Sequence, residues 1–98
     1  MRLEVNPFRM GTDKEAALKP LEESAEVFGA WQEYEEFWHN LYMVEEDVRW
    51  MIEEQLENEI ADCVTACVNL AERHGLDLQT ALERVEKHNR ERGRYGSD

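Results

Sequence analysis

The segment 56–74, LENEIADCVTACVNLAERH, constrains the fold most strongly because it carries the most regular apolar pattern in the chain. Its apolar positions recur at steps of three and four residues, which is the spacing of one face of a helix turned toward a core. These positions are Leu56, Ile60, Cys63, Cys67, Leu70 and His74. Two acids, Glu59 and Asp62, flank this stripe and project from the same side of the helix. We therefore expect a cation or a basic group between these two carboxylates.

The composition restricts the class of partner. The chain has 98 residues, 42% of them apolar, which is enough for one domain with a single core, and we treat 1–98 as that domain. Its 23 acids and 11 bases give a net charge of −12. This charge argues against nucleic acid as a partner, because such proteins neutralise phosphates with bases. Divalent cations are the natural partners of this charge, although an acidic surface also serves simple solubility.

The two cysteines and the N-terminal residues bear on location. Cys63 and Cys67 lie four residues apart on the apolar stripe, without a CxxC arrangement or a zinc-like spacing, so we interpret them as reduced core thiols. No window reaches the roughly 18 apolar residues of a membrane span, and residues 1–11 do not form a signal peptide. We expect a cytoplasmic protein that has no membrane partner.

The remaining sequence predicts helices on both sides of the acidic pattern. Residues 1–11 are expected to be an extended lead-in whose Leu3, Val5 and Phe8 alternate against the core. Thr12 or Asp13 is the predicted N-cap of the first helix. Pro20 either kinks that helix or begins a new one.

Further along the chain, the helical pattern continues with two breaks. The predicted inward face of the first long helix consists of Leu21, Ala25, Phe28, Trp31 and Tyr34 or Glu35. Residues 41–55 form either a separate helix or the first half of a long helix that ends at Gly75. Asp77 then caps a final helix, and residues 93–98 form a flexible tail. The sequence thus predicts an all-α fold, a small bundle of four to five helices.

A second pair of acids resembles the first. Glu23 and Glu26 are three residues apart on one helix, as Glu59 and Asp62 are on another. If the two turns lie level in an antiparallel pair, four carboxylates converge, and without a histidine such a group favours Mg²⁺ or Mn²⁺ over zinc or iron. In a chain with 35% charged residues the same spacing also arises on solvated faces, which is the alternative interpretation.

The order of the motifs resembles that of the MazG-type all-α nucleoside triphosphate pyrophosphohydrolases. Segment 19–27, KPLEESAEV, is similar to the K-x-x-E-E-x-x-E-V opening of that family, and segment 59–62, EIAD, to its E-x-x-D turn. The helix, turn and helix of segments 67–71 and 75–82 and the closing segment 86–92, EKHNRER, also resemble the family. The resemblance covers residues 14–95. It departs from the family in Pro20 and in the long segment from Trp31 to Gln55, which separates the acid turns.

The resemblance implies a MazG-like fold and Mg²⁺-dependent hydrolysis of a nucleoside or deoxynucleoside triphosphate to the monophosphate and pyrophosphate, by attack of water on the α-phosphorus. It implies that Glu22 and Glu23 are catalytic, with Glu22 behind the ligands or positioning the water. The implied metal ligands are Glu23, Glu26, Glu59 and Asp62. The implied substrate-binding residues are Lys19, Lys87, Asn89 and Arg92, although Lys87 and Arg92 also suit an ordinary helix C-terminus.

Three further expectations concern assembly and rival functions. The resemblance implies a homodimer or homotetramer, and the many apolar stripes of so small a bundle favour a partner chain. The aromatic residues of the segment 28–50 suit a core or subunit interface better than stacking on a base. The alternative functions are a phosphoribosyl-ATP pyrophosphohydrolase, which resembles this acid pattern, and a non-catalytic acidic helical interaction module.

Overall fold

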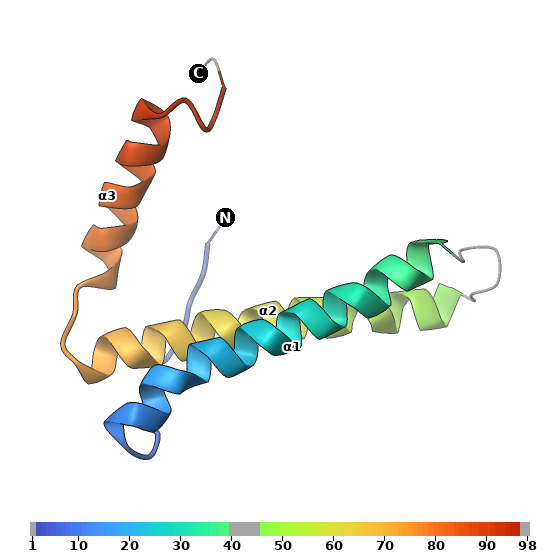
Figure 1. The fold of residues 1–98 in the computed structure, drawn as a ribbon, viewed down its shortest axis with the longest axis horizontal. Coiled ribbons are helices and arrows are strands. Elements are labelled where there is room, and N and C mark those ends of the chain that lie inside the picture. Colours follow the sequence, from blue (N-terminus) through green and yellow to red (C-terminus); the bar gives the residue numbers. More distant parts are fainter. Residues whose placement is uncertain (1, 40–45, 97–98) are drawn as a thin grey trace.

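The computed structural model describes residues 2–39 and 46–96, and these residues form an all-α structure, as predicted (Figure 1). Three helices, rather than the predicted four to five, occupy this part of the chain, and it contains no strand. The helices are α1 (Asp13–His39), α2 (Glu46–Arg73) and α3 (Leu78–Glu91). In the described residues, neither of the two optional breaks adds a helix: α1 continues through Pro20, and α2 continues past residue 55, where a separate helix over 41–55 would have ended.

The first helix begins at the Thr12 N-cap, whose hydroxyl accepts a hydrogen bond of 3.2 Å from the Glu15 backbone N–H. α1 continues through Pro20 as a single helix of 27 residues. Of the two alternatives for Pro20, the structure therefore supports the one in which Pro20 lies within a single helix and does not begin a new one. Proline removes one backbone donor there, and the length of packed helix on both sides compensates for it.

α2 is one long helix, which was one of the two alternatives for the segment from residue 41 to Gly75. It runs for 28 residues and ends before Gly75, which has a φ of +64°. The amide of Gly75 donates to the Glu72 carbonyl at 3.1 Å, and the amide of Leu76 donates to the Ala71 carbonyl at 2.9 Å. These bonds form the expected glycine-dependent C-cap. The expected helical positions Leu41, Met43 and Val44 lie outside the described residues.

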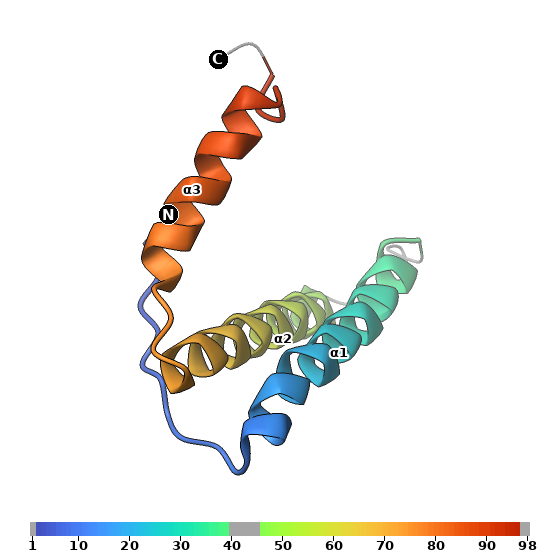
Figure 2. The same ribbon diagram turned by 60° about the vertical axis from the view of Figure 1, so that its left-hand side comes forward.

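α1 and α2 lie side by side and antiparallel, which both ribbon views show (Figures 1 and 2). The buried positions of α1 are seven residues apart, at Ala16, Glu23, Ala30 and Phe37. Ala66 is the buried apolar residue of α2. Small residues allow the two backbones to approach closely, and the heptad spacing keeps one face of α1 along α2. One acid, Glu23, occupies a position in this seam.

The predicted inward face was wrong for most of α1, and on α2 only part of the predicted stripe is covered, at Leu56, Cys63 and Leu70. On α1, Leu21 and Phe28 are 68% and 58% exposed, and on α2 Ile60 is 47% exposed. Cys67, and His74 just beyond the end of α2, are also exposed. The periodicity identified the helices correctly, but each helix turns an alanine-containing face to the other. Phe37 is a large apolar side chain that is buried, whereas Leu21, Phe28 and Ile60 are largely exposed.

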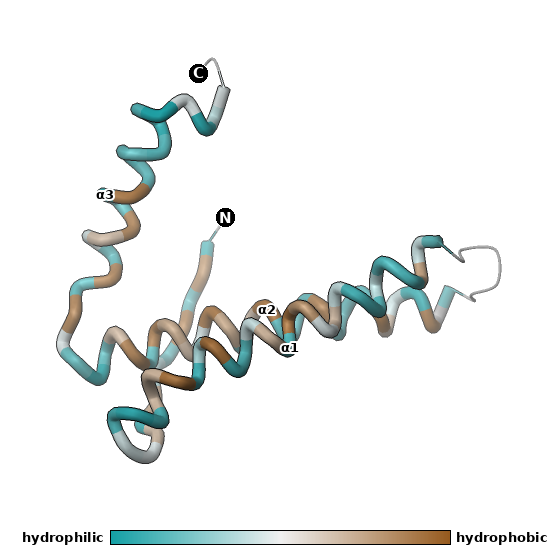
Figure 3. Tube along the Cα trace, in the orientation of Figure 1, coloured by the Kyte–Doolittle hydropathy of each residue, from teal (hydrophilic) through white to brown (hydrophobic). Residues whose placement is uncertain are grey.

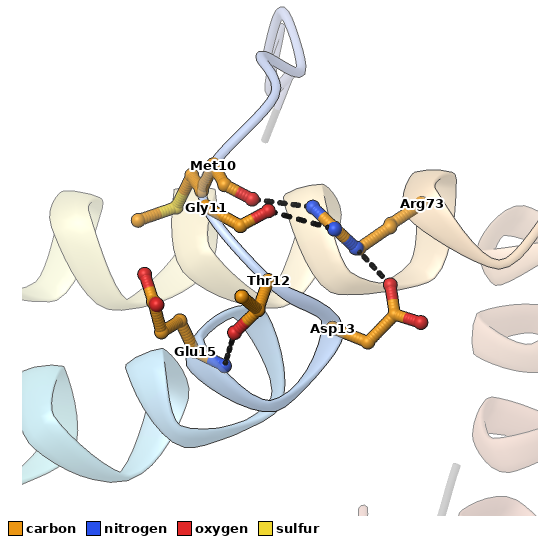
Figure 4. A network of polar contacts seen from close by, with 6 residues as sticks. All are labelled: Met10, Gly11, Thr12, Asp13, Glu15 and Arg73. Atoms are coloured by element: carbon orange, nitrogen blue, oxygen red, sulfur yellow. Dashed lines mark hydrogen bonds and ion pairs between the residues drawn. The ribbon is translucent and has the colours of Figure 1, made fainter.

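The lead-in is non-helical, as predicted, but polar contacts attach it to the end of α2. The Arg73 guanidinium donates to the carbonyls of Met10 and Gly11 and contacts Asp13 Oδ1 at 2.6 Å (Figure 4). The backbone N–H of Phe8 donates to Asn69 Oδ1 at 2.8 Å.

The expected apolar role of the lead-in was wrong in its detail. The side chains of Leu3 and Phe8 are 67% and 59% exposed, and only Val5 is partly covered. The lead-in is held mainly through its backbone, because Arg73 donates to two of its carbonyls and Asn69 accepts from one of its amides.

The third helix leaves the end of α2 and points away from the α1–α2 pair (Figures 1 and 2). Asp77 is its N-cap, as predicted, and accepts from the Thr80 amide at 3.0 Å. Gly93, with φ +71°, and Arg94 close its C-terminus by bonds to the carbonyls of Arg90 and Asn89. Residues 93–96 of the expected flexible tail thus form turns that cap α3, and residues 97–98 lie outside the description. None of the residues of α3 is buried.

None of the described helices combines the length and the apolar character that crossing a membrane requires.

Candidate metal centre

Two helices bring three of the four predicted metal ligands together. Glu23 and Glu26 of α1 and Glu59 of α2 each offer one carboxylate oxygen, and these oxygens lie within 4.8 Å of one another. The antiparallel packing of α1 on α2 produces this convergence, because it places the two acid turns level along the seam. Two oxygens bound to one cation at 2.0–2.1 Å are at most about 4.2 Å apart, so the cluster matches a single-cation site after small side-chain adjustments.

Two oxygens of this cluster are buried without a hydrogen bond. Glu23 is 7% exposed, and among the described residues neither Glu23 Oε2 nor Glu59 Oε2 receives a hydrogen bond. A buried carboxylate oxygen without a donor is costly, and buried charges in proteins are normally paired or bound to metals. The residues present therefore fit a hard divalent cation such as Mg²⁺ or Mn²⁺, whose preferred ligands are carboxylate oxygens.

Lys19 supplies a positive charge at one side of the cluster. Its Nζ lies 3.2 Å from Glu23 Oε1 and 3.6 Å from Glu22 Oε2. The hydrogen bond to Glu23 and the charge of that carboxylate raise the pKa of Lys19 above its ordinary value. Lys19, predicted to bind substrate, therefore pairs with Oε1 of Glu23, and Glu23 Oε2 stays buried without a hydrogen bond.

Glu26 responds most clearly to the crowding of charge. A hydrogen bond to Glu23 and the negative charge of Glu23 raise the pKa of Glu26 above its ordinary value of 4.5, and desolvation and the charge of Glu59 act in the same direction. Without a metal, a proton on Glu26 thus relieves part of the repulsion among the three carboxylates.

This pKa shift predicts a pH dependence of stability. Because the folded chain holds the Glu26 proton more tightly than the unfolded chain does, this group makes folding less favourable as the pH rises from the ordinary value of 4.5 through the raised folded value. We expect the difference in melting temperature between Glu26→Gln and the wild type, measured without metal from about pH 4 to about pH 7, to become more favourable to the variant as the pH rises. Parallel pH profiles of the two proteins would contradict the prediction.

Asp13 and Asp77 act at lower pH and with the opposite sign. The Arg73 guanidinium lowers the pKa of Asp13, and hydrogen bonds from Thr80 lower the pKa of Asp77, both from an ordinary value of 3.8. Their stabilisation is therefore present above that value and is lost as the pH falls below it. The two effects are separated in pH, so the Glu26 comparison isolates the cluster.

The other predicted site residues lie outside the three-carboxylate cluster. Asp62 is exposed on the next turn of α2 from Glu59 and is not part of the group. Glu22 is exposed beside Lys19. Lys87 and Asn89 are on α3, which points away from the α1–α2 pair (Figure 1), and Arg92 is the C-cap of that helix. Arg92 Nη2 donates to Asn89 Oδ1 at 2.7 Å. Within one chain the structure does not bring these three residues to the cluster.

The polar contacts of Asn69 and Arg73 were missed by sequence reasoning. Asn69 is 5% exposed, and Arg73 joins the lead-in to α2. The signal was an amide and a guanidinium within an otherwise apolar helical stretch, where each needs a partner.

The two cavities described in the structure, of about 290 and 660 Å³, are lined by other residues than the cluster acids.

The chain was compared with known proteins. No family model, no curated protein and no solved structure matches it.

Proposed function

We propose that the chain is a divalent-cation-dependent hydrolase that converts a nucleoside or deoxynucleoside triphosphate to the monophosphate and pyrophosphate. The observation that supports this best is the pair of buried carboxylate oxygens, Glu23 Oε2 and Glu59 Oε2, which come from two helices and receive no hydrogen bond within the described residues. A cation site explains why the seam keeps these acids. The choice of substrate rests on the order of the motifs, which resembles that of the MazG-type enzymes.

In this proposal, Glu23, Glu26 and Glu59 hold the cation. Asp62 is the fourth candidate ligand, because it lies one helical turn from Glu59 and its exposed side chain is able to change rotamer. When bound, Mg²⁺ or Mn²⁺ neutralises triphosphate charge and makes water a better nucleophile. The carboxylates fix the position of that charge relative to the substrate, which is the main task in phosphoryl chemistry.

Two residues beside the cluster have roles in handling the proton and the phosphates. The exposed Glu22 carboxylate, whose Oε2 lies 3.6 Å from Lys19 Nζ, accepts a proton from the attacking water in this proposal. Lys19 is the base nearest to the cluster acids in the described ion pairs, so it is the first candidate to contact a substrate phosphate. The assignment of Lys87, Asn89 and Arg92 to the far phosphates stays a prediction.

The test is a product assay. Incubation of the protein with each common NTP and dNTP and Mg²⁺, followed by anion-exchange chromatography, is expected to yield the monophosphate and pyrophosphate. Glu59→Gln is expected to lose about 100-fold or more of this activity, because a carboxylate that holds the catalytic cation is lost. The matched control is Glu57→Gln, which removes an exposed acid from the same helix and is expected to retain activity.

The products separate this proposal from its rivals. Diphosphate plus phosphate would contradict it, and so would the absence of turnover with every nucleotide. Turnover of phosphoribosyl-ATP alone would assign the alternative substrate. Binding of Mn²⁺ at the cluster without any turnover would favour the non-catalytic helical module.

A further inference from the structure

A cavity lies where the lead-in crosses the first turn of α1 and the last turns of α2. It has a volume of about 290 Å³, close to the lower end of the range for ligand pockets. Its lining combines the apolar side chains of Phe8 and Met10 with the polar side chains of Arg9, Asn69 and Glu72. Polar and apolar positions adjoin at this end of the helix pair (Figure 3). The cavity thus has the composition of a ligand pocket, in which a few polar groups lie in an apolar setting.

One buried donor in this cavity has almost no partner. Asn69 is 5% exposed, and its Oδ1 accepts from the Phe8 amide at 2.8 Å. The contact of its Nδ2 among the described residues is with the sulfur of Met10 at 3.7 Å. A thioether is a weak acceptor, and buried donors in proteins normally have a full hydrogen-bond partner. Asn69 therefore offers a donor to an acceptor atom of a ligand.

The charges around the cavity nearly cancel. Asp13 and the carbonyls of Met10 and Gly11 engage the Arg73 guanidinium (Figure 4). Arg9 forms no ion pair or hydrogen bond within residues 2–39 and 46–96, and the Glu72 carboxylate in the same lining balances its charge. A phosphate group needs an excess of bases, so this cavity suits an uncharged and partly polar group better.

The accessible side chains of the lining suit a flat heteroaromatic ring. The Phe8 side chain is 59% exposed, so its ring is accessible at the edge of the cavity. Nucleic-acid bases stack on aromatic side chains, because every base has a π-face. Bases also carry carbonyl or ring-nitrogen acceptors for an amide donor such as Asn69, and N–H groups for a carboxylate such as Glu72. A base therefore matches both the surface and the polar groups of the cavity.

The cavity and the three-carboxylate cluster are separated by about the length of one nucleotide. On α1, Glu23 follows the lining residue Ala16 by seven residues, which is about 10 Å along the helix. On α2, Asn69 follows Glu59 by ten residues, which is about 15 Å in the same direction, since the helices are antiparallel. Lys19 lies between the two sites, with its Nζ 3.2 Å from Glu23 Oε1. An extended nucleoside triphosphate with its phosphates at the cluster therefore reaches the cavity with its base.

We propose that this cavity binds the base of the nucleotide substrate. The Phe8 ring stacks on the base, the Asn69 amide donates to one of its acceptor atoms, and the Glu72 carboxylate accepts from one of its N–H groups. The identity of the ligand rests on the proposed hydrolase activity. Nucleosides, which carry no phosphate and need no cation, nevertheless test the cavity by itself.

The first test is the binding of nucleosides to the metal-free protein. Titrations with adenosine, guanosine, cytidine and uridine are followed in an amide nitrogen–proton correlation spectrum. At least one nucleoside is expected to shift the Phe8 backbone amide and the Asn69 side-chain amide, with a dissociation constant of about 1 mM. Signals of α3, which does not line this cavity, are expected to stay in place.

Removal of the Phe8 ring tests the stacking. Phe8→Ala keeps the backbone N–H that Asn69 accepts, and it is expected to weaken nucleoside binding about tenfold. The matched control is Phe28→Ala, because Phe28 is 58% exposed but lies on α1 outside the cavity. This control is expected to bind nucleosides as the wild type does.

Replacement of the Asn69 amide tests the hydrogen bond. Asn69→Asp keeps an acceptor for the Phe8 amide but replaces the donor by a carboxylate, so it is expected to weaken nucleoside binding about tenfold or more. Asn58→Asp makes the same change of charge at an exposed position of α2 and is expected to leave binding unchanged. The dispersion of each spectrum checks that the variant is folded.

Hydrolysis supplies a second readout. For the preferred nucleoside triphosphate, Phe8→Ala is expected to raise KM about tenfold and to change kcat less than about twofold, because it removes binding shared by ground state and transition state. Hydrolysis of inorganic triphosphate, which has no base, is expected to be the same in Phe8→Ala and the wild type.

Three results would overturn the base site. The first is the absence of shifts at the Phe8 and Asn69 amides with every nucleoside up to about 10 mM. The second is unchanged binding in Asn69→Asp, or an equal loss in Phe8→Ala and Phe28→Ala. The third is hydrolysis of inorganic triphosphate as efficient as that of every nucleoside triphosphate, which would leave the hydrolase activity itself intact. Nucleoside binding at the cavity without any turnover would instead contradict the hydrolase and support the site.

Discussion

Glu59→Gln is expected to stabilise the metal-free protein and to abolish its response to Mn²⁺. The wild type keeps three carboxylates together, and Glu59 Oε2 is buried without a hydrogen bond. A glutamine amide removes one negative charge and supplies a donor, which we expect to raise the free energy of unfolding by about 1 kcal/mol. For a domain of this size the melting temperature rises by about 4–8 °C. The measurement is a thermal melt without metal at a fixed protein concentration.

Glu59→Gln is also expected to lose stabilisation by the bound cation, and this effect on the free energy of unfolding is larger than the change in the metal-free protein. A ligand that binds only the folded chain, present at 100 times its dissociation constant, adds about 2.7 kcal/mol to the free energy of unfolding. We expect this increase for the wild type with Mn²⁺ and none for Glu59→Gln. Glu57→Gln should respond as the wild type does, because Glu57 is an exposed acid of the same helix outside the cluster. An equal Mn²⁺ response of all three proteins would show that the cluster is not the binding site.

The combination of the two results is more informative than either alone. A structural carboxylate that stabilised the fold would lower the melting temperature when replaced. An acid retained for a bound cation gives the opposite sign, because the folded chain without metal carries the repulsion without its compensation. This sign therefore distinguishes a cation site from an ordinary polar position in the seam.

Asn69→Ala is expected to destabilise the chain by detaching the lead-in from α2. Asn69 is 5% exposed, and its side chain accepts from the Phe8 amide at 2.8 Å and donates to Met10 Sδ at 3.7 Å. Its loss leaves the Phe8 amide without its partner, at a cost of about 1–3 kcal/mol in the free energy of unfolding. Thermal melts measure this cost, and hydrogen exchange at the Phe8 amide, which should become faster, locates it.

A control variant and a companion variant make this prediction specific. Asn58→Ala replaces an exposed asparagine of the same helix and is expected to change stability by less than about 0.5 kcal/mol. Arg73→Met should also free the lead-in, because it removes the donors to the Met10 and Gly11 carbonyls. Equal stability of Asn69→Ala and Asn58→Ala, together with unchanged exchange at Phe8, would contradict this role of Asn69.

The helix boundaries could be predicted where a local rule determines them. Gly75 and Asp77 were recognised as caps, and Thr12 was one of the two alternatives with Asp13, because each satisfies or permits a bond within its own turn; the structure confirms Thr12, Gly75 and Asp77. The Glu23–Glu26 and Glu59 turns were also recognised, since acids three residues apart share a helix face whatever the fold. The number of helices was not predictable, because Pro20 permits a continuous helix as well as a break.

The packing faces show where local reasoning fails. A stripe of apolar residues indicates that a helix buries that face, but it does not indicate against which partner. In this chain Phe28 and Ile60 lie outside the α1–α2 seam, while Ala30, Ala66 and Glu23 lie within it. The contacts of Asn69 and Arg73 with residues about 60 positions earlier depend on the same long-range packing, so no local pattern contains them.

The amino-acid sequence by itself determined the all-α class, the caps of the helices and the two acid turns, because these features depend on interactions within a few residues. Only the tertiary structure decided that Glu23, Glu26 and Glu59 converge, that Asp62 lies outside their cluster and that α3 buries none of its residues. The physical reason is that the register and rotation of one helix against another are determined by the sum of many long-range contacts. At Glu59, therefore, the sequence supplied the acid and the packing of α1 on α2 supplied its neighbours.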